Sequence, residues 1–516
     1  MGLFLNSVSQ YRSSLYETAR NLLKSRGNQN RRAEDFAKQV GELKTQNEQL
    51  VSRVKQTQKE LDQAQQLLRH AHLEIQQLHT QPITLKSDLP LPHHSYGPKM
   101  ISLCINLSKS LGFRPARRAL EIIFQWLQIK TEIPTWDSMR SWACRVGIAE
   151  LEKPVQASDD WIWMADHSNQ IGKEKVLQII GIRASELPPR GSTLRHEDMT
   201  VLAVVPGTDW KREDVREQYE MLAKRIGPPR YLLTDGAVEL RESADTLGKP
   251  GKEVIVLRDM KHYAANVFER LIGKSDRFKD YLSHLGRTRS SIQQTELSHF
   301  TPPPQKPKAR FMNLGPTLRW GQMVSYHLSD GLSKSRREVS PERMNEKLGW
   351  LHGFRTDLAS WNRCQDVMLE SLKFINLQGL YRGASDDLKL ALDSLKSKDW
   401  ECCDLSESMS SQLIAFVKES EQCHSADERT WLSTEILESS FGLFKSLEGQ
   451  HSKGGFTSLI AAMPTMMTDC TPELIRENLR NVTVKKMKQW VTDKLGATLA
   501  SKKVMAYREF TFDKPC

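Results

Sequence analysis

The sequence lacks the features that mark a secreted, disulfide-bonded or membrane-spanning protein. Its 516 residues include only eight cysteines, which are scattered without paired spacing. No stretch approaches the ~18 consecutive apolar residues that a membrane helix needs. The first residues show no basic-then-apolar signal pattern and no myristoylation site, since Asn6 stands where Ser or Thr is required. We therefore expect a protein of the reducing cytoplasm with no membrane partner.

Acidic charge is also in deficit. Lys and Arg total 74 against 63 Asp and Glu, which gives a net charge of +11. A balance this basic makes a polyanion such as DNA the expected partner, although it says nothing about the fold. The chain is long enough to form several domains, each with a core of its own.

Residues 33–80 have the heptad pattern of a coiled coil, between a basic segment at 1–32 and a proline-containing linker at 81–98. β-Branched residues at a with Leu at d favour two parallel strands, and Asn47 at an a position fixes the register. The pattern predicts a homodimer through residues 36–78. The alternative is one long helix packed on its own protein. Apolar and small residues recur at alternating spacings of four and three: Phe36, Val40, Leu43, Asn47, Leu50, Val54, Thr57, Leu61, Ala64, Leu68, Ala71, Ile75 and Leu78.

Residues 99–157 are predicted to form a small helical DNA-binding unit. Its three helices are expected at 99–111, at 115–127 and from 135 to a stop at Gly147. The last helix is predicted to expose Arg140 and Arg145, and a basic third helix is typical of a helix-turn-helix reader of the major groove. The alternative is a helical subdomain whose arginines are only solvated.

The stretch 158–262 changes to a strand pattern. Three strands, a helix, a strand, a helix and a strand follow in the order of the ribonuclease H-like fold, which places the first and fourth strands side by side at the sheet centre. Residues 263–432 are predicted to form a large helical insertion, and 433–516 a further helix with a basic helical tail. The strands are expected at 161–166, 174–182, 199–205, 231–236 and 254–257, and the helices at 211–225 and 238–246.

Two aspartates end the strands that this order makes neighbours. Asp166 ends the first strand and Asp235 ends the fourth. Two carboxylates that lie close together repel each other, and the usual remedy is a divalent cation. Oxygen ligands with room for water and phosphate suit Mg²⁺, for which Mn²⁺ can substitute. Two such ions can activate the attacking oxygen and stabilise the leaving one in phosphoryl transfer.

A third acid, Glu438, lies on a helix predicted around 433–448. Leu437 and the phenylalanines that follow it at i+4 and i+7 form the buried stripe of this helix, while Glu438, Gly442 and Lys445 form the neighbouring stripe. Gly442 would let backbone or substrate approach closely, and Lys445 would meet a phosphate of the DNA.

These residues resemble the catalytic domain of bacterial insertion-sequence transposases of the Asp-Asp-Glu type. In that family the two aspartates end the first and fourth strands, and the glutamate lies in a helix reading roughly Glu-Ser-x-Phe-Gly-x-x-Lys. Asp166, Asp235 and Glu438 match these positions, and the resemblance covers 158–262 and 430–460. It implies an α/β ribonuclease H-like catalytic domain with a helical insertion. The implied activity is metal-dependent cleavage of transposon ends and transfer of the 3′-hydroxyl into target DNA by a nucleoid-associated bacterial enzyme.

Several assignments stay open. Glu435, one turn before Glu438, is the rival third ligand. Asp259 and His262, at the end of the fifth strand, are expected either to support the metal ligands or to contact DNA. His167, beside Asp166, could belong to the site or be structural, and a histidine next to an acid is more often structural.

Other functions also stay open. The pairs Cys402-Cys403 and Cys423-His424 are interpreted as ordinary helix residues, because adjacent cysteines rarely both bind one zinc ion. The three acids could be strand-end and helix-face residues on a degenerate sheet. The functional alternatives are a catalytically inactive DNA-binding protein on the same fold and a structure-specific nuclease.

Overall fold

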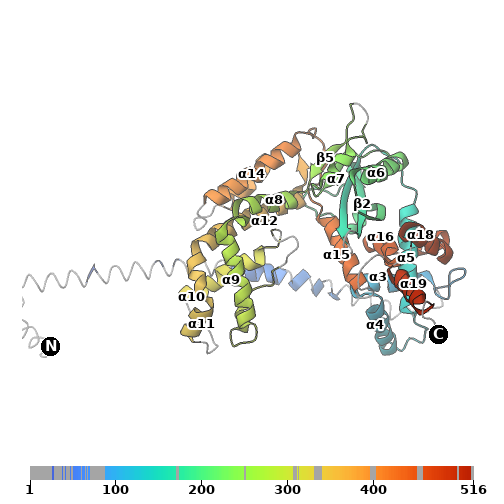
Figure 1. The fold of residues 1–516 in the computed structure, drawn as a ribbon, viewed down its shortest axis with the longest axis horizontal. Coiled ribbons are helices and arrows are strands. Elements are labelled where there is room, and N and C mark those ends of the chain that lie inside the picture. The colour runs from blue at the N-terminus through green and yellow to red at the C-terminus, as the bar shows by residue number, and fades with distance from the viewer. Residues whose placement is uncertain are drawn as a thin grey trace, which may run out of the picture. The chain divides into compact units, whose positions relative to one another are not determined.

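The chain divides into two compact units, residues 1–87 and residues 88–516, in a computed structural model. Figure 1 shows the chain as a ribbon. The structure describes residues 26–27, 38, 41, 47, 50–59, 61–63, 65–66, 68–69, 88–169, 174–248, 251–305, 311, 313–330, 340–395, 403–449, 457–496 and 499–512.

The described residues of the first unit are helical and exposed. Four apolar heptad positions, Leu50, Val54, Leu61 and Leu68, are 56%, 65%, 48% and 60% exposed in the single chain. Within the predicted coil at 36–78, the structure describes residues 38, 41, 47, 50–59, 61–63, 65–66 and 68–69, and the other positions lie outside the described residues. The a and d positions of the heptad form the seam that is expected to pair with a second copy. In the single chain, the four apolar seam residues named above are exposed to solvent.

A five-stranded mixed sheet forms the centre of the second unit (Figure 1). The strand order is β3-β2-β1-β4-β5, in which β1 and β2, and β2 and β3, run antiparallel, whereas β1 and β4, and β4 and β5, run parallel. All five predicted strands are confirmed, and so is the pairing of the first with the fourth. The sheet is compatible with a ribonuclease H-like fold. Its strands are β1 (Trp161–Asn169), β2 (Glu174–Arg183), β3 (Thr200–Thr208), β4 (Tyr231–Thr234) and β5 (Ile255–Arg258).

The two faces of the sheet are covered by different helices. On one face, Trp161 and Trp163 of β1 pack with Val215 and Tyr219 of α6 (Arg212–Ile226) in a fully apolar cluster. On the other face lies α15 (Glu435–Gly449) (Figure 1). Because successive side chains of a strand point to opposite faces, this division decides which acids of β1 and β4 can meet α15. The short helix α7 (Val238–Arg241) and a 3₁₀ turn, η4 (Glu242–Ala244), connect β4 to β5.

The predicted DNA-binding helices are present, but they belong to a larger helical body. They are α3 (Pro98–Leu111), α4 (Phe113–Trp126) and α5 (Trp136–Glu152). They pack against η10 (Ser458–Ala462), α16 (Met463–Met467), α17 (Pro472–Asn481) and α18 (Val484–Leu495) from the other end of the chain. The last described helix is α19 (Leu499–Phe512). In the preceding connection, the Asp88 carboxylate accepts the backbone N–H groups of Lys99 and Met100 at the start of α3.

Gly147 does not end α5, which corrects the expected boundary. The helix continues for five residues beyond it, to Glu152. A Cβ at position 147 would lie 2.0 Å from the carbonyl oxygen of Ala461, so the glycine allows η10 to approach the helix backbone. The glycine marks a close helix contact here, which the sequence pattern cannot distinguish from a helix stop.

The stretch between β5 and α15 is almost entirely helical, as predicted for the insertion. Its longest helix, α12, packs against α8, α10, α13 and α14. A two-stranded pair, β6 (Leu380–Tyr381) and β7 (Arg429–Thr430), lies beside α14. None of the described helices is long and apolar enough to cross a membrane. The helices of the stretch are α8 (Met260–Phe268), α9 (Asp276–Ile292), α10 (Gly315–Asp330), α11 (Pro341–Leu348), α12 (Arg355–Gln378), α13 (Ala384–Asp393) and α14 (Asp404–Glu421), with shorter turns η5 (Glu269–Gly273), η6 (Ser298–Phe300) and η9 (Gly349–Phe354).

Candidate active site

The two aspartates lie side by side on neighbouring strands. Ala165 of β1 pairs with Thr234 of β4, so Asp166 and Asp235 follow at the same level of two parallel strands. Both belong to the face opposite α6, because Ala165 joins the apolar cluster with α6 and side chains alternate. The Asp235 carboxylate accepts the backbone N–H of Ala237 at 2.8 Å, which fixes its orientation. The adjacency expected from the strand order is therefore present.

Helix α15 brings Glu438 to the same face of the sheet. Gln178 of β2 pairs in register with Asp166 of β1. The hydroxyl of Ser440 on α15 donates to the side-chain oxygen of Gln178 at 3.2 Å. Leu437, Phe441 and Phe444 of α15 are buried, which confirms the predicted apolar stripe. Glu438 is half-buried on the next stripe, and Gly442 and Lys445 are exposed there. No described atom lies within 4 Å of a Cβ built on Gly442, so this glycine leaves open space instead of a close backbone contact.

The charges of the three acids act on one another. Burial, and then the neighbouring Asp235, raise the pKa of Asp166 to about 7, and Glu438 adds to the increase. The backbone N–H of His167 and the His262 ring oppose this increase. A carboxyl group with a pKa raised by two other acids is a group whose ionised form needs a cation nearby.

Two basic side chains, Lys261 and His262, contact the carboxylate of Glu438. The ammonium of Lys261 lies 2.8 Å from Oε2, and the Nε2 atom of His262 lies 3.2 Å from Oε1. Although burial acts to raise it, hydrogen bonds from His262 and Lys261 lower the pKa of Glu438 to about 2. Sequence reasoning missed Lys261. The available signal was its place two residues beyond Asp259, at the sheet edge where Asp166 and Asp235 also end their strands.

The donor chemistry of this site fits a hard divalent cation, but its present geometry is not that of a ligand set. Among the described residues, no group of three or more His, Cys, Asp and Glu side chains is arranged to hold a metal ion. Both oxygens of Glu438 are engaged, one by Lys261 and the other by His262. Asp166 and Asp235, at neighbouring strand ends, supply the oxygen ligands that Mg²⁺ prefers.

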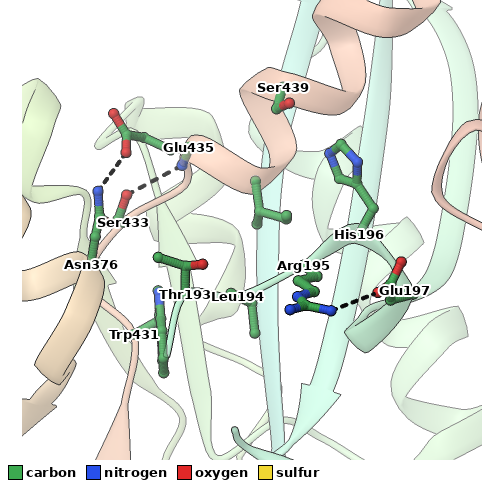
Figure 2. Close-up of a pocket in the computed structure, with 11 residues that line it drawn as sticks. Thr193, Leu194, Arg195, His196, Glu197, Asn376, Trp431, Ser433, Glu435 and Ser439 are labelled. Carbon is green, nitrogen blue, oxygen red and sulfur yellow. Dashed lines mark hydrogen bonds and ion pairs between the residues drawn. The ribbon is translucent and has the colours of Figure 1, made fainter. Parts of the chain in front are cut away.

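Glu435, the rival third ligand, points to a different neighbour. Its Oε2 atom accepts the amide of Asn376 at 2.6 Å, and its Oε1 atom lies 3.1 Å from Lys261. Figure 2 shows Glu435 turned towards Asn376 at one side of a cavity of about 480 Å³. The charge of Glu438, and not that of Glu435, is among the main influences on the pKa of Asp166. This observation favours Glu438 as the third acid.

Asp259 supports the site from below and does not face DNA. It is fully buried, and its carboxylate accepts the backbone N–H of His262 at 2.7 Å, which caps α8. It also accepts the backbone N–H and the hydroxyl of Thr434, at 2.5 and 3.0 Å. Asp259 therefore ties the start of α8 to the start of α15. His167 is buried, and burial lowers its pKa to about 4, in agreement with the expected structural role.

The predicted exposure of Arg145 is wrong. Its side chain is only 5% exposed, and its guanidinium donates to the carbonyl oxygens of Val482 at 2.6 Å and Leu479 at 2.8 Å. The chain between α17 and α18 packs over this face of α5, which the local helix pattern could not reveal. Arg140 is partly exposed and pairs with Asp137 at 3.1 Å, so it stays a candidate for DNA contact.

The described residues of the two Cys and His pairs belong to no group arranged to hold a metal ion. His424 is buried and stacks on Tyr231 with the ring centroids 4.7 Å apart, and burial lowers its pKa to about 4. Cys423 is exposed, and Cys403 immediately precedes α14. Cys402 lies outside the described residues. Cys403 caps the start of α14, and Cys423 and His424 follow its end, so the expected placement of these residues within helices is wrong.

No protein-family model and no curated protein sequence matches the chain. Among solved structures, it is similar to a chain of the Drosophila P element transposase strand transfer complex. That likeness has a TM-score of 0.37 and 11% sequence identity, and it covers 80% of this chain and 99% of the other. A TM-score this low does not establish a shared fold, so the functional argument rests on the geometry of the site.

Proposed function

We propose that the chain is a metal-dependent DNA transposase of the Asp-Asp-Glu type, which cuts transposon ends and joins the 3′-hydroxyl to target DNA. The observation that supports this most is the convergence of Asp166, Asp235 and Glu438 on one face of the sheet from β1, β4 and α15. Burial, and then the charge of Asp235, raise the pKa of Asp166, so a cation held nearby would stabilise its ionised form. The net charge of +11 suits a DNA substrate.

In this proposal Asp166, Asp235 and Glu438 hold Mg²⁺, or Mn²⁺ in its place. A divalent cation held there would supply the positive charge that activates the attacking oxygen and stabilises the leaving oxygen of the phosphodiester. The chain's own residues set the positions. Gln178 and Ser440 hold α15 over the sheet, and Asp259 fixes the start of that helix. Exposed Lys445, on the same side of α15 as Glu438, contacts a DNA phosphate.

The test uses the purified full-length chain, Mg²⁺ and the DNA that flanks its gene, which should carry inverted repeats and short target duplications. We expect nicks that leave 3′-hydroxyls at the element ends, followed by joined products. Asp166→Asn, Asp235→Asn and Glu438→Gln should each reduce cleavage by at least about 1,000-fold, as loss of a metal ligand does in phosphoryl transfer. Asp159→Asn is the matched control, since this exposed aspartate precedes β1 at the opposite end of the strand.

The outcomes separate the alternatives. Cleavage without joining, in the presence of a supplied target, would assign the chain to the structure-specific nucleases. DNA binding with intact ends under all metal conditions would contradict the proposal and favour a catalytically inactive DNA-binding protein. Cleavage that survives all three acid substitutions would show that the chemistry lies elsewhere in the chain.

A further inference from the structure

Lys261 lies between two glutamates of the same helix. Its ammonium is 2.8 Å from Oε2 of Glu438 and 3.1 Å from Oε1 of Glu435. The two glutamates are three residues apart on α15, so both project towards the start of α8. The Lys261 side chain is 19% exposed, which makes it the most buried member of this charged trio.

The partners of the two glutamates differ. Both oxygens of Glu438 are engaged, one by Lys261 and one by His262. In Glu435, Oε2 is held by Asn376 and Oε1 meets Lys261. A cation that binds Glu438 is repelled by the two basic groups on its oxygens and competes with them, whereas Glu435 can keep both of its contacts.

We propose that Lys261 exchanges partners: when Glu438 takes up a divalent cation, Lys261 withdraws to Glu435, which holds it there as a neutral pair. This inference rests on the proposed function, because it takes Glu438 as a metal ligand. Lys261 and Glu435 are then positioning residues that make Glu438 available without leaving an unpaired ammonium in a partly buried site. An ammonium that lost its only carboxylate partner would carry the full cost of its desolvation.

The exchange explains why a second acid stands one turn before Glu438 without belonging to the carboxylate cluster. If Glu435 were absent, Lys261 would have Glu438 as its only carboxylate partner and would compete with the cation for it. If Lys261 were absent, Glu438 would face one basic group fewer. The two substitutions are therefore expected to change cation affinity in opposite directions, and the effect of Glu435 is expected to depend on Lys261.

The experiment measures Mn²⁺ binding to the full-length chain without DNA, by electron paramagnetic resonance of the free ion. Lys261→Met should tighten binding about tenfold, on the order expected from removing one nearby positive charge. Glu435→Gln should weaken it roughly three- to tenfold. In the Lys261→Met background, adding Glu435→Gln should weaken binding clearly less, because only the direct attraction of the Glu435 charge is lost once the lysine that it retains is gone.

Two control variants test whether the change in Mn²⁺ affinity comes from the charge at position 261. Lys261→Arg keeps the charge and should bind Mn²⁺ within about twofold of the natural chain. Lys279→Met removes a lysine of the same charge from α9, where it pairs with Asp276 at the surface, and should leave the affinity unchanged. Circular dichroism and thermal unfolding of each variant check that the fold is retained.

An equal loss of affinity on Glu435→Gln in both backgrounds would show that Glu435 acts on the cation directly, as a charge or a ligand, and would overturn the exchange. Unchanged affinity in Lys261→Met would overturn it as well. Failure of the proposed function has a separate signature. If Asp166→Asn and Asp235→Asn leave Mn²⁺ binding intact, the carboxylate cluster is no metal site, and both proposals fall together.

Discussion

Arg145 is a charged residue whose role is decided by residues more than 300 positions away. Its guanidinium donates to the carbonyl oxygens of Val482 and Leu479, and burial lowers its pKa to about 10. Arg145→Met keeps the apolar stem but leaves two buried carbonyls without donors. We expect the free energy of unfolding to fall by about 3 kcal/mol.

Urea unfolding followed by tryptophan fluorescence measures this loss. Arg140→Met is the matched control, because Arg140 lies one turn and a half earlier on α5 and makes a half-exposed ion pair. Arg140→Met should lower the free energy of unfolding by less than about 1 kcal/mol. For DNA affinity, the larger loss is expected for Arg140→Met and the smaller loss for Arg145→Met. A stability loss that is equal in the two variants would contradict the structural role of Arg145.

Glu448, near the end of α15, gives the stability a pH dependence. Burial raises its pKa to about 7, and Lys445 offsets this only in part. From pH 4.5 to 7 the folded chain keeps a proton that the unfolded chain releases, so the free energy of unfolding contributed here falls as pH rises through this window. Glu448→Gln stays neutral. The free energy of unfolding of Glu448→Gln should exceed that of the natural chain by up to about 3 kcal/mol at pH 8 and by much less at pH 5.

Urea unfolding of both chains at pH 5 and pH 8 checks the sign. Glu477→Gln, at an exposed position of α17, removes the same charge and should leave the pH dependence unchanged. Parallel curves for the natural chain and Glu448→Gln would show that Glu448 is already ionised in the folded protein near pH 5.

At the scale of elements, the strands of the sheet could be predicted because each carries its own signal. The runs ending at Asp166 and Asp235 are apolar and bounded by turn-forming residues, and their order along the chain implies their pairing. The position of Glu438 followed from the apolar stripe of α15, which must face the sheet. Two of the three acids and the helix that carries the third were therefore accessible from local periodicity.

The contacts between α8 and α15 that position Glu438 could not be predicted from local periodicity. Lys261 meets Glu438 where Asp259 binds Thr434 and ties α8 to α15 across 175 positions of sequence. No periodicity encodes such a contact. The burial of Arg145 has the same cause, because a helix pattern shows which residues share a face and not which distant segment will cover that face.

Gly147 and Gly442 are two helix glycines for which the structure predicts opposite responses to alanine. A Cβ at Gly147 would lie 2.0 Å from the Ala461 carbonyl oxygen, whereas a Cβ at Gly442 meets no described atom within 4 Å. Gly147→Ala should force η10 away from α5 and cost about 3 kcal/mol. Gly442→Ala should stabilise the chain by about 0.5–1 kcal/mol through helix propensity.

Thermal unfolding of the two alanine variants measures the contrast directly, since each serves as the control for the other. A stabilising effect at both positions would show that the contact between α5 and η10 can open at little cost. Destabilisation at both would contradict the open space around Gly442.

At the scale of the whole molecule, the proposed reaction needs two DNA ends held at once, and the heptad residues supply a means of pairing two chains. A helix over residues 36–78 would be roughly 60 Å long, at ~1.5 Å per residue. In the described part of it, Leu50, Val54, Leu61 and Leu68 are each about half exposed or more in the single chain. In a parallel dimer, Asn47 at an a position would face the same residue of the second chain, where two amides can bond each other.

We therefore expect the chain to be a dimer through residues 36–78, and its seam to be sensitive to charge. Leu61→Glu with Leu68→Glu places two carboxylates per chain at a positions, so the dimer should dissociate in sedimentation velocity. Gln63→Glu with Gln66→Glu adds the same charge outside the seam and should leave the dimer intact. The seam variant should still bind a single DNA end through the second unit, but it should fail to bring two ends together. Paired-end complexes at the natural level in the seam variant, or in a chain lacking residues 33–80, would show that this helix is an intramolecular strut.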